Sequence, residues 1–154
     1  MQKANPWQSY RQVATLTATP GQLVLMLYDG AIRFLEQARV GFTYDDPLDF
    51  NQTINNYILK AQAIINELNQ YLDMKNGGDC ASNFRRLYDY LDRRLQESNQ
   101  HKEEKGIVEV ISRLTVLRNA WAEMLQKGHE TPVTGIDPAG LGSSDSSGSL
   151  CAIG

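Results

Sequence analysis

The sequence contains few of the residues on which membrane spans, disulfide frameworks and reactive centres depend. Among its 154 residues are two cysteines and two histidines, and no apolar run approaches the roughly 18 residues of a membrane-spanning helix. The cysteines, Cys80 and Cys151, are too few for a disulfide framework, which favours a reducing compartment. The first residues lack the apolar core of a signal peptide. We therefore expect a cytoplasmic protein without membrane insertion.

The chain also has no surplus of positive charge. Its 15 lysines and arginines are outnumbered by 18 aspartates and glutamates, and the net charge is −3. This balance gives no general attraction to nucleic acid, and we predict none as a partner. Arginines do occur in two adjacent pairs that an acidic partner could recognise, Arg85-Arg86 and Arg93-Arg94. Because Asp89, Asp92 and Glu97 follow at helical spacing, we favour a solvated face of balanced charge.

Candidate catalytic and metal-binding residues are equally scarce. A di-metal site in a helical bundle uses Glu-x-x-His pairs, and neither His101 nor His129 has a glutamate three residues before it. Cys80 lies near a predicted helix N-terminus, where a thiol can become reactive, but we favour a small apolar residue packed on the core. The pair Gly77-Gly78 is typical of a helix stop rather than a phosphate-binding loop. We predict no enzyme activity, no metal and no cofactor.

What the sequence does contain is four amphipathic segments with helical spacing. The first begins at Thr19, an N-cap residue followed by Pro20 and Gln22 in the pattern of a capping box. The second begins at Asp46, with Pro47 as its first helical residue. In both segments the apolar residues advance by three and four positions, as in a bundle seam; in the first these are Val24, Tyr28, Ala31, Leu35, Ala38 and Phe42.

The third and fourth segments follow a glycine-rich stop at residues 75–78. We expect Asp79 to cap the third helix, residues 98–102 to form a polar connector, and the fourth helix to end near Gly128. Four helices of about 20–25 residues with short connectors predict an all-α, antiparallel up-down four-helix bundle.

Two further segments flank the predicted bundle of residues 20–128. Residues 1–19 form a short N-terminal leader whose apolar residues include Trp7 and Tyr10. Their spacing of three suits either a short helix or a segment laid along a groove. Residues 129–154 are rich in glycine and serine and lack periodicity, which predicts a flexible C-terminal tail.

The first predicted helix has more apolar surface than one buried face requires. Between Leu23 and Leu35 the apolar positions cover an arc of about 200°, whereas an ordinary bundle helix buries about 100°. Some of this surface calls for a cover beyond the neighbouring helices, as in helix-in-groove recognition. The leader could instead fill the trough and leave an ordinary closed bundle. Gly30 interrupts the same stretch and could admit the backbone of a partner, the leader or a neighbouring helix.

Four sequence blocks, together with Tyr10 in the leader, occur in an informative order. They are Thr19-Pro20-Gly21-Gln22-Leu23-Val24-Leu25-Met26-Leu27-Tyr28-Asp29-Gly30-Ala31-Ile32, Ile58-x-Lys60-Ala61-x-x-Ile64-Ile65-x-Glu67-Leu68, Asn83-Phe84-x-x-Leu87-Tyr88-Asp89-Tyr90-Leu91-x-x-Arg94-Leu95 and Leu117-Arg118-x-Ala120-Trp121. In these blocks the sequence resembles the FliS family of flagellin-export chaperones. The resemblance covers residues 5–127, nearly the whole predicted bundle and part of the leader.

This resemblance implies a cytoplasmic export chaperone with the bundle fold. Members of the family bind the C-terminal, helix-forming segment of flagellin, prevent its premature polymerisation and deliver it to the flagellar type III export gate. The flagellin segment wraps around the outside of the bundle, and the leader can lie on the same apolar surface. Carried over by position, the resemblance assigns partner contacts to Trp7, Tyr10, Leu23, Leu27, Tyr28, Gly30 and Phe34.

A self-associating helical scaffold without flagellin binding is the alternative. The wide apolar arc of the first helix could pair with a second copy of the chain, and the residues leave the oligomeric state open. A stable homodimer that does not bind flagellin would favour the scaffold, whereas retention of a flagellin C-terminal peptide would favour the chaperone.

Overall fold

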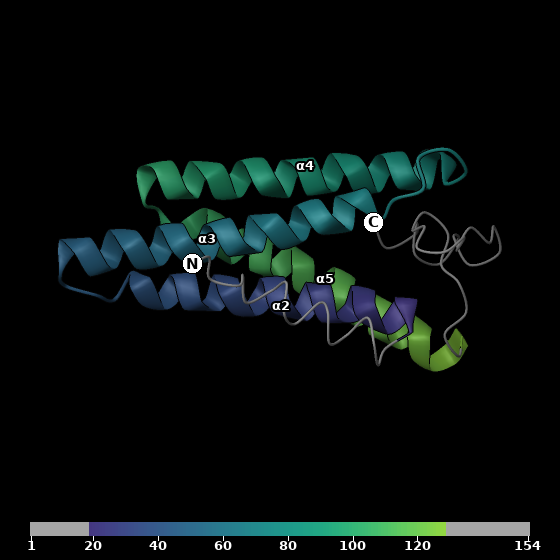
Figure 1. The fold of residues 1–154 in the computed structure, drawn as a ribbon, viewed down its shortest axis with the longest axis horizontal. Coiled ribbons are helices and arrows are strands. Elements are labelled where there is room, and N and C mark those ends of the chain that lie inside the picture. The colour runs from purple at the N-terminus through teal and green to yellow at the C-terminus, as the bar shows by residue number, and fades with distance from the viewer. Residues whose placement is uncertain (1–18, 129–154) are drawn as a thin grey trace, which may run out of the picture.

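The computed structural model describes residues 19–128, which form four helices in one antiparallel bundle: α2 (Pro20–Gly41), α3 (Pro47–Gln70), α4 (Gly78–His101) and α5 (Glu104–Gly128). In Figure 1 consecutive helices run in opposite directions, and each packs beside two others in the order α2, α3, α4, α5 and back to α2. This confirms the predicted all-α bundle. The predicted leader up to residue 18 and the predicted tail from residue 129 lie outside the described residues.

Polar side chains begin α2 and α3 as predicted. The Thr19 hydroxyl accepts a hydrogen bond from the Gln22 amide at 3.2 Å, and the Gln22 side chain accepts one from the Thr19 amide at 3.1 Å. Asp46 accepts a hydrogen bond from the Asp49 amide at 2.9 Å, and each helix has proline as its first residue. These bonds satisfy amide groups that a helix N-terminus otherwise leaves unpaired.

The start of α4 differs from the prediction. The helix begins at Gly78 without a side-chain cap, so Asp79 lies inside the first turn instead of before it. The preceding turn is held by Asp73, whose carboxylate accepts hydrogen bonds from the amides of Lys75 and Asn76 at 3.2 and 3.0 Å. Gly78 then takes a φ of +58°, which glycine adopts at little cost. The chain therefore enters the helix earlier than a capping aspartate would allow.

The predicted polar connector after the third helix is also wrong. Residues 98–101 continue α4, and Lys102 caps it in the left-handed conformation with a φ of 53°. The Lys102 ammonium donates hydrogen bonds to the backbone and side-chain oxygens of Asn99, both at 2.7 Å. Polar residues do not end a helix when neither glycine nor proline interrupts them, and this stretch has neither.

The core lies between all four helices and includes two buried tyrosines. The hydroxyls of Tyr28 on α2 and Tyr88 on α4 are 2.5 Å apart and share a hydrogen bond across the bundle. The Trp121 indole N–H donates a hydrogen bond to the Gly21 carbonyl at 2.7 Å. Burial raises the pKa of Tyr28 to about 12 and that of Tyr88 well above its usual value. These buried polar atoms pair with one another, which offsets the cost of removing them from water.

Cys80 lies in the first turn of α4 and packs into the core cluster, as we expected of a small apolar residue. Cys151 lies outside the described residues.

Candidate partner-binding surface

Most of the predicted contact residues on α2 are buried. Leu27 and Tyr28 are 1 % exposed, Leu23 is 9 % exposed and Gly30 is buried. Leu27 and Tyr28 belong to a core cluster that includes residues of α3, α4 and α5. The bundle therefore covers the middle of the wide apolar arc, and the expected need for a further cover is confined to its edges. A partner contact of these four residues stays a prediction.

Glycines allow α2 and α3 to approach each other closely. A Cβ atom on Gly30 would lie 3.2 Å from Cδ1 of Ile64, and one on Gly41 would lie 2.9 Å from Cγ2 of Thr53. Both distances are shorter than ordinary van der Waals contact, so the missing side chains make room for α3. Of the alternatives left open for Gly30, close approach of a neighbouring helix is the one that the structure shows.

Phe34 lies at the α3 edge of the arc and is half-buried. Its ring centroid is 6.0 Å from that of Tyr57 on α3, and the Lys60 ammonium lies 5.6 and 4.9 Å from the Phe34 and Tyr57 centroids. We call these three residues the aromatic–lysine cluster; such a cation over exposed aromatic faces contributes about 0.5–1 kcal/mol. Tyr57 and Lys60 are not among the contacts predicted from the sequence, although their spacing of three places them on one face of α3.

The opposite edge of the arc borders a groove between α2 and α5, which we call the α2/α5 groove. It has a volume of about 460 Å³ and is lined by Thr19, Gln22, Leu25, Arg118, Ala122, Leu125 and Gln126. An ion pair joins its two helices, with 2.7 Å between Arg118 Nε and Asp29 Oδ1. Leu25 and Leu125 are half-buried, so apolar surface remains accessible on this edge too. Helix periodicity alone does not say which helices are neighbours, so this groove could not be predicted from the sequence.

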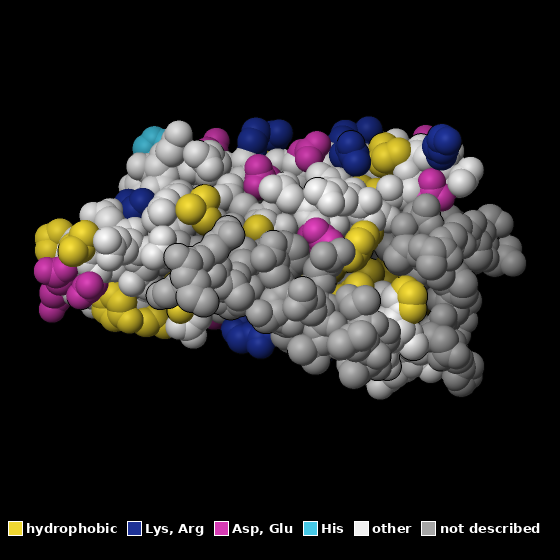
Figure 2. Space-filling model, in the orientation of Figure 1, with side chains coloured by type: hydrophobic (Ala, Val, Ile, Leu, Met, Phe, Trp, Pro, Cys, Tyr) yellow, Lys and Arg dark blue, Asp and Glu magenta, His cyan; other side chains and the backbone are white. Residues whose placement is uncertain are grey.

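Large apolar side chains are also exposed at the opposite end of α2 and on α3. Val40, Tyr44 and Leu48 are exposed around the turn from α2 to α3, and Leu59 on α3 is 51 % exposed. Figure 2 shows hydrophobic and acidic side chains together at the end of the bundle where this turn lies. Grouped apolar side chains on a protein surface are typical of interaction sites.

The described residues present grooves and apolar side chains that suit binding. No group of three or more His, Cys, Asp or Glu side chains within residues 19–128 is placed to hold a metal ion. None of the four described helices is both long and apolar enough to cross a membrane. Trp7 and Tyr10, the predicted contacts on the leader, lie outside the described residues.

Comparison with known proteins places this bundle among flagellar proteins. A family model described as "Flagellar protein FliS" matches residues 3–128. The flagellar secretion chaperone FliS of Bacillus subtilis (strain 168) is 34% identical over 122 residues, which cover 79% of this chain and 87% of the relative. FliS of Salmonella typhimurium is 34% identical over 131 residues, covering 82% of this chain and 95% of the relative. FliS of Escherichia coli (strain K12) is 33% identical over 131 residues, covering 81% and 93%.

Proposed function

Because the chain belongs to the FliS family of flagellar secretion chaperones, we propose that it binds the C-terminal helical segment of flagellin in the cytoplasm. Binding keeps that segment from premature polymerisation and supports its delivery to the flagellar type III export gate. The proposed activity consists of association and release, so it requires no catalytic group, metal or cofactor.

The observation that carries this proposal is the accessible apolar surface along both edges of α2. One edge carries the aromatic–lysine cluster and the other borders the α2/α5 groove. A flagellin segment that folds on binding loses conformational freedom, so it needs a long apolar surface to offset that loss. Two apolar edges on one helix supply such a surface without opening the core.

Direct contacts belong, in this proposal, to the edge residues of α2. Phe34 is half-buried. Leu23 is more exposed than Leu27 and Tyr28, which are also predicted contacts on this helix. Leu27, Tyr28 and Gly30 support the surface from below, because they hold α2 against its neighbouring helices.

The leader, residues 1–19, is proposed to compete with flagellin for this surface. Trp7 and Tyr10 are its aromatic residues, and they would occupy apolar positions that flagellin later takes. Such competition lowers the apparent affinity for flagellin by the fraction of molecules in which the surface is free. Deleting residues 1–18 is therefore expected to raise flagellin affinity and the binding of a dye that reports exposed apolar surface. Unchanged affinity and dye binding would count against the competition.

The proposal is tested by co-purification of the full chain with a synthetic flagellin C-terminal peptide. Phe34→Asp is expected to weaken retention at least about tenfold, because a carboxylate would enter the apolar edge of α2. Val116→Asp is the matched control, since Val116 is an exposed apolar residue on α5. Thermal unfolding of both variants separates lost binding from lost folding. If the unmodified chain does not retain the peptide, or if it forms a stable homodimer instead, the proposal is wrong.

A further inference from the structure

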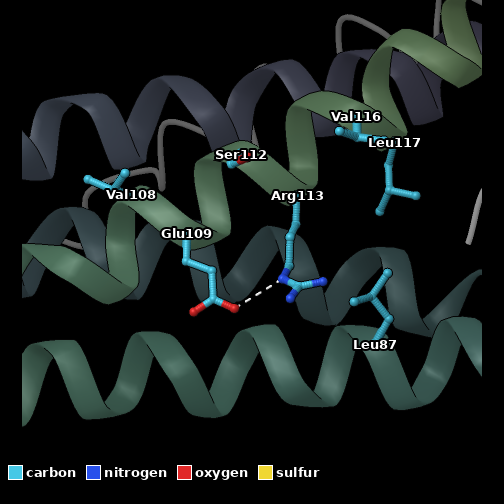
Figure 3. Close-up of a pocket in the computed structure, with 7 residues that line it drawn as sticks. All are labelled: Leu87, Val108, Glu109, Ser112, Arg113, Val116 and Leu117. Carbon is cyan, nitrogen blue, oxygen red and sulfur yellow. Dashed lines mark hydrogen bonds and ion pairs between the residues drawn. The ribbon is translucent and has the colours of Figure 1, made fainter.

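A second groove lies between α4 and α5, across the bundle from the aromatic–lysine cluster. This α4/α5 groove has a volume of about 440 Å³ and is lined by Leu87, Val108, Glu109, Ser112, Arg113, Val116 and Leu117. In Figure 3, Leu87 and Leu117 approach each other from the two helices, whereas Glu109 and Arg113 point from α5 towards α4. Val108 and Val116 are 43 and 55 % exposed. The groove therefore combines an apolar wall with a charged one.

The negative charge of Glu109, the acidic residue in this groove, is compensated by neighbouring hydrogen-bond donors. Glu109 accepts hydrogen bonds from the Tyr90 hydroxyl at 2.6 Å, from Arg94 Nε at 2.8 Å and from Arg113 Nε at 3.0 Å. These hydrogen bonds, that of Tyr90 foremost, lower the pKa of Glu109 to about 2. The carboxylate thus stays ionised and paired, and it does not repel an incoming anion as an isolated glutamate would.

Two arginines, Arg93 and Arg113, lie against the Tyr90 ring and are called the arginine rim; of the two, Arg113 lines the groove itself. The guanidinium groups of Arg93 and Arg113 lie 5.9 and 5.5 Å from the centroid of the Tyr90 ring. The Arg113 side chain is 51 % exposed, and its Nε makes the hydrogen bond to Glu109. Contact with an aromatic ring restrains a guanidinium before any ligand arrives, which reduces the entropy lost when a carboxylate binds to it.

The aspartates of α4 do not balance these arginines, because they lie on the side of α3. The Asp89 carboxylate accepts a hydrogen bond from the Asn69 amide on α3 at 3.0 Å. The Asp92 carbonyl accepts one from the Gln62 amide on α3 at 3.3 Å, and burial raises the pKa of the Asp92 carboxyl. The expected solvated face of balanced charge is thus divided. Asp89 and Asp92 face α3, and Glu97 pairs with Arg94 at 3.3 Å, whereas Arg93 and Arg113 lie beside the Tyr90 ring.

We propose that the α4/α5 groove docks an acidic amphipathic helix of a protein partner other than flagellin. Aliphatic side chains of that helix would pack against Leu87, Val108 and Val116, and its carboxylates would pair with Arg93 and Arg113. Val108 and Val116 are eight residues apart on α5, which corresponds to about 12 Å or two helical turns. A short partner helix laid along α5 can therefore reach both valines and the arginine rim. The α2/α5 and α4/α5 grooves share no lining residue, and the aromatic–lysine cluster lies across the bundle, so flagellin and the second partner can bind together.

The test uses the full chain and a fluorescently labelled synthetic peptide of about five helical turns. Leucines occupy one face of the peptide and glutamates flank them; a second peptide carries lysines in place of the glutamates. Fluorescence anisotropy is expected to show saturable binding of the glutamate peptide that weakens as salt is added, because screening reduces the attraction to the arginines. Equal affinity for the lysine peptide, or no saturable binding of the glutamate peptide, would overturn the proposal.

Matched variants locate the binding on the bundle. Arg113→Glu and Val116→Asp are each expected to weaken binding of the glutamate peptide at least about tenfold. Arg85→Glu is the charge control, since Arg85 lies on another face of α4 by helical phase, and Leu59→Asp is the apolar control, since Leu59 is 51 % exposed on α3. Both controls are expected to bind as the unmodified chain does. Equal losses in the controls and in the groove variants would show that the peptide binds elsewhere.

Two further measurements keep the inference independent of folding and of the proposed function. Arg113→Gln removes the charge with a smaller perturbation, and it is expected to weaken peptide binding several-fold while circular dichroism stays unchanged. Addition of the flagellin C-terminal peptide is expected to leave binding of the glutamate peptide intact, whereas competition would place both on one surface and overturn the inference. Failure of flagellin binding alone would contradict the proposed function and leave this surface standing.

Discussion

The α2–α3 interface and the α4–α5 interface are built in different ways. Gly30 and Gly41 bring α2 close to α3, and aromatic pairs such as Phe42 and Phe50, whose centroids are 5.5 Å apart, fill the interface. Between α4 and α5, Glu109 instead gathers one tyrosine and two arginines around a single carboxylate. The first interface depends on shape, most tightly at Gly41, where a side chain would collide with Thr53 and Ile54. The second depends on charge, so it responds to pH and salt.

The largest expected effect breaks the shape-dependent interface. Gly41→Leu would place a Cβ atom 2.9 Å from Cγ2 of Thr53 and 3.0 Å from Cγ1 of Ile54, so α2 and α3 must move apart. We expect the free energy of unfolding to fall by about 2–3 kcal/mol. Urea denaturation monitored by circular dichroism measures the change. Unchanged stability would mean that this interface is more loosely packed than its distances indicate.

A smaller effect is expected from the charge-dependent interface. Glu109→Gln removes the charge that accepts from Tyr90, Arg94 and Arg113, and we expect a loss of about 1–2 kcal/mol after solvent screening. Glu123→Gln, at an exposed position on the same helix, is the control and is expected to be near neutral. A control that lost as much stability as Glu109→Gln would argue against a specific role of the network.

The pH dependence of stability also distinguishes the α4–α5 interface, which depends on charge, from the α2–α3 interface, which depends on shape. The pKa of Glu109 is lowered to about 2 in the folded chain, below the value of 4.5 usual for glutamate. Its contribution to stability is therefore present above about pH 4.5 and is lost as the pH falls towards 2. Urea titrations across that range are expected to show a shallower acid loss for Glu109→Gln than for the unmodified chain. Gly41→Leu is expected to keep the original slope, because no titrating group is involved.

The smallest effect is expected at Gly30. In Gly30→Ala the new Cβ atom lies 3.2 Å from Cδ1 of Ile64, the flexible end of a side chain that can shift slightly. Alanine also favours a helix interior over glycine by roughly 1 kcal/mol. These opposing terms should leave the free energy of unfolding within about 1 kcal/mol of the original. A loss as large as that of Gly41→Leu would show that Ile64 cannot yield.

The contrast between local and long-range signals explains what could be predicted from the sequence. Thr19 and Asp46 mark helix starts because a cap bonds within three residues of itself, and both starts are confirmed. The polarity of residues 98–102 predicts a connector, although polarity on one face is compatible with a helix. The Glu109 network joins residues 15 and 19 positions apart on different helices. Helical phase does not show which helix lies opposite, so this network could not be predicted.

The predicted contact residues on α2 show the same limit, because the sequence does not tell which residues a neighbouring helix covers. The family resemblance and the wide apolar arc predict partner contacts at Leu27 and Tyr28, and the structure places both in the core. An apolar arc does not distinguish surface covered by neighbouring helices from surface left for a partner. Phe34 differs because it lies at the edge of the arc, beside Tyr57 and Lys60. Whether a residue lies at the edge or in the middle of the arc is therefore a better guide to its exposure than its presence in the arc.

The hydroxyl pair at the centre of the bundle gives the protein an internal optical reporter. Tyr28 ionises only near pH 12, and Tyr88 also ionises late, so both phenols stay neutral at pH values at which exposed tyrosines lose their protons. Phenol ionisation is visible in ultraviolet absorbance. Cargo that binds to the outside of a closed bundle leaves the pKa values of both phenols unchanged. Cargo that separates α2 from α4 exposes the phenols to water and lowers their pKa values towards those of exposed tyrosines. An alkaline titration with and without cargo therefore distinguishes a rigid cradle from a bundle that opens.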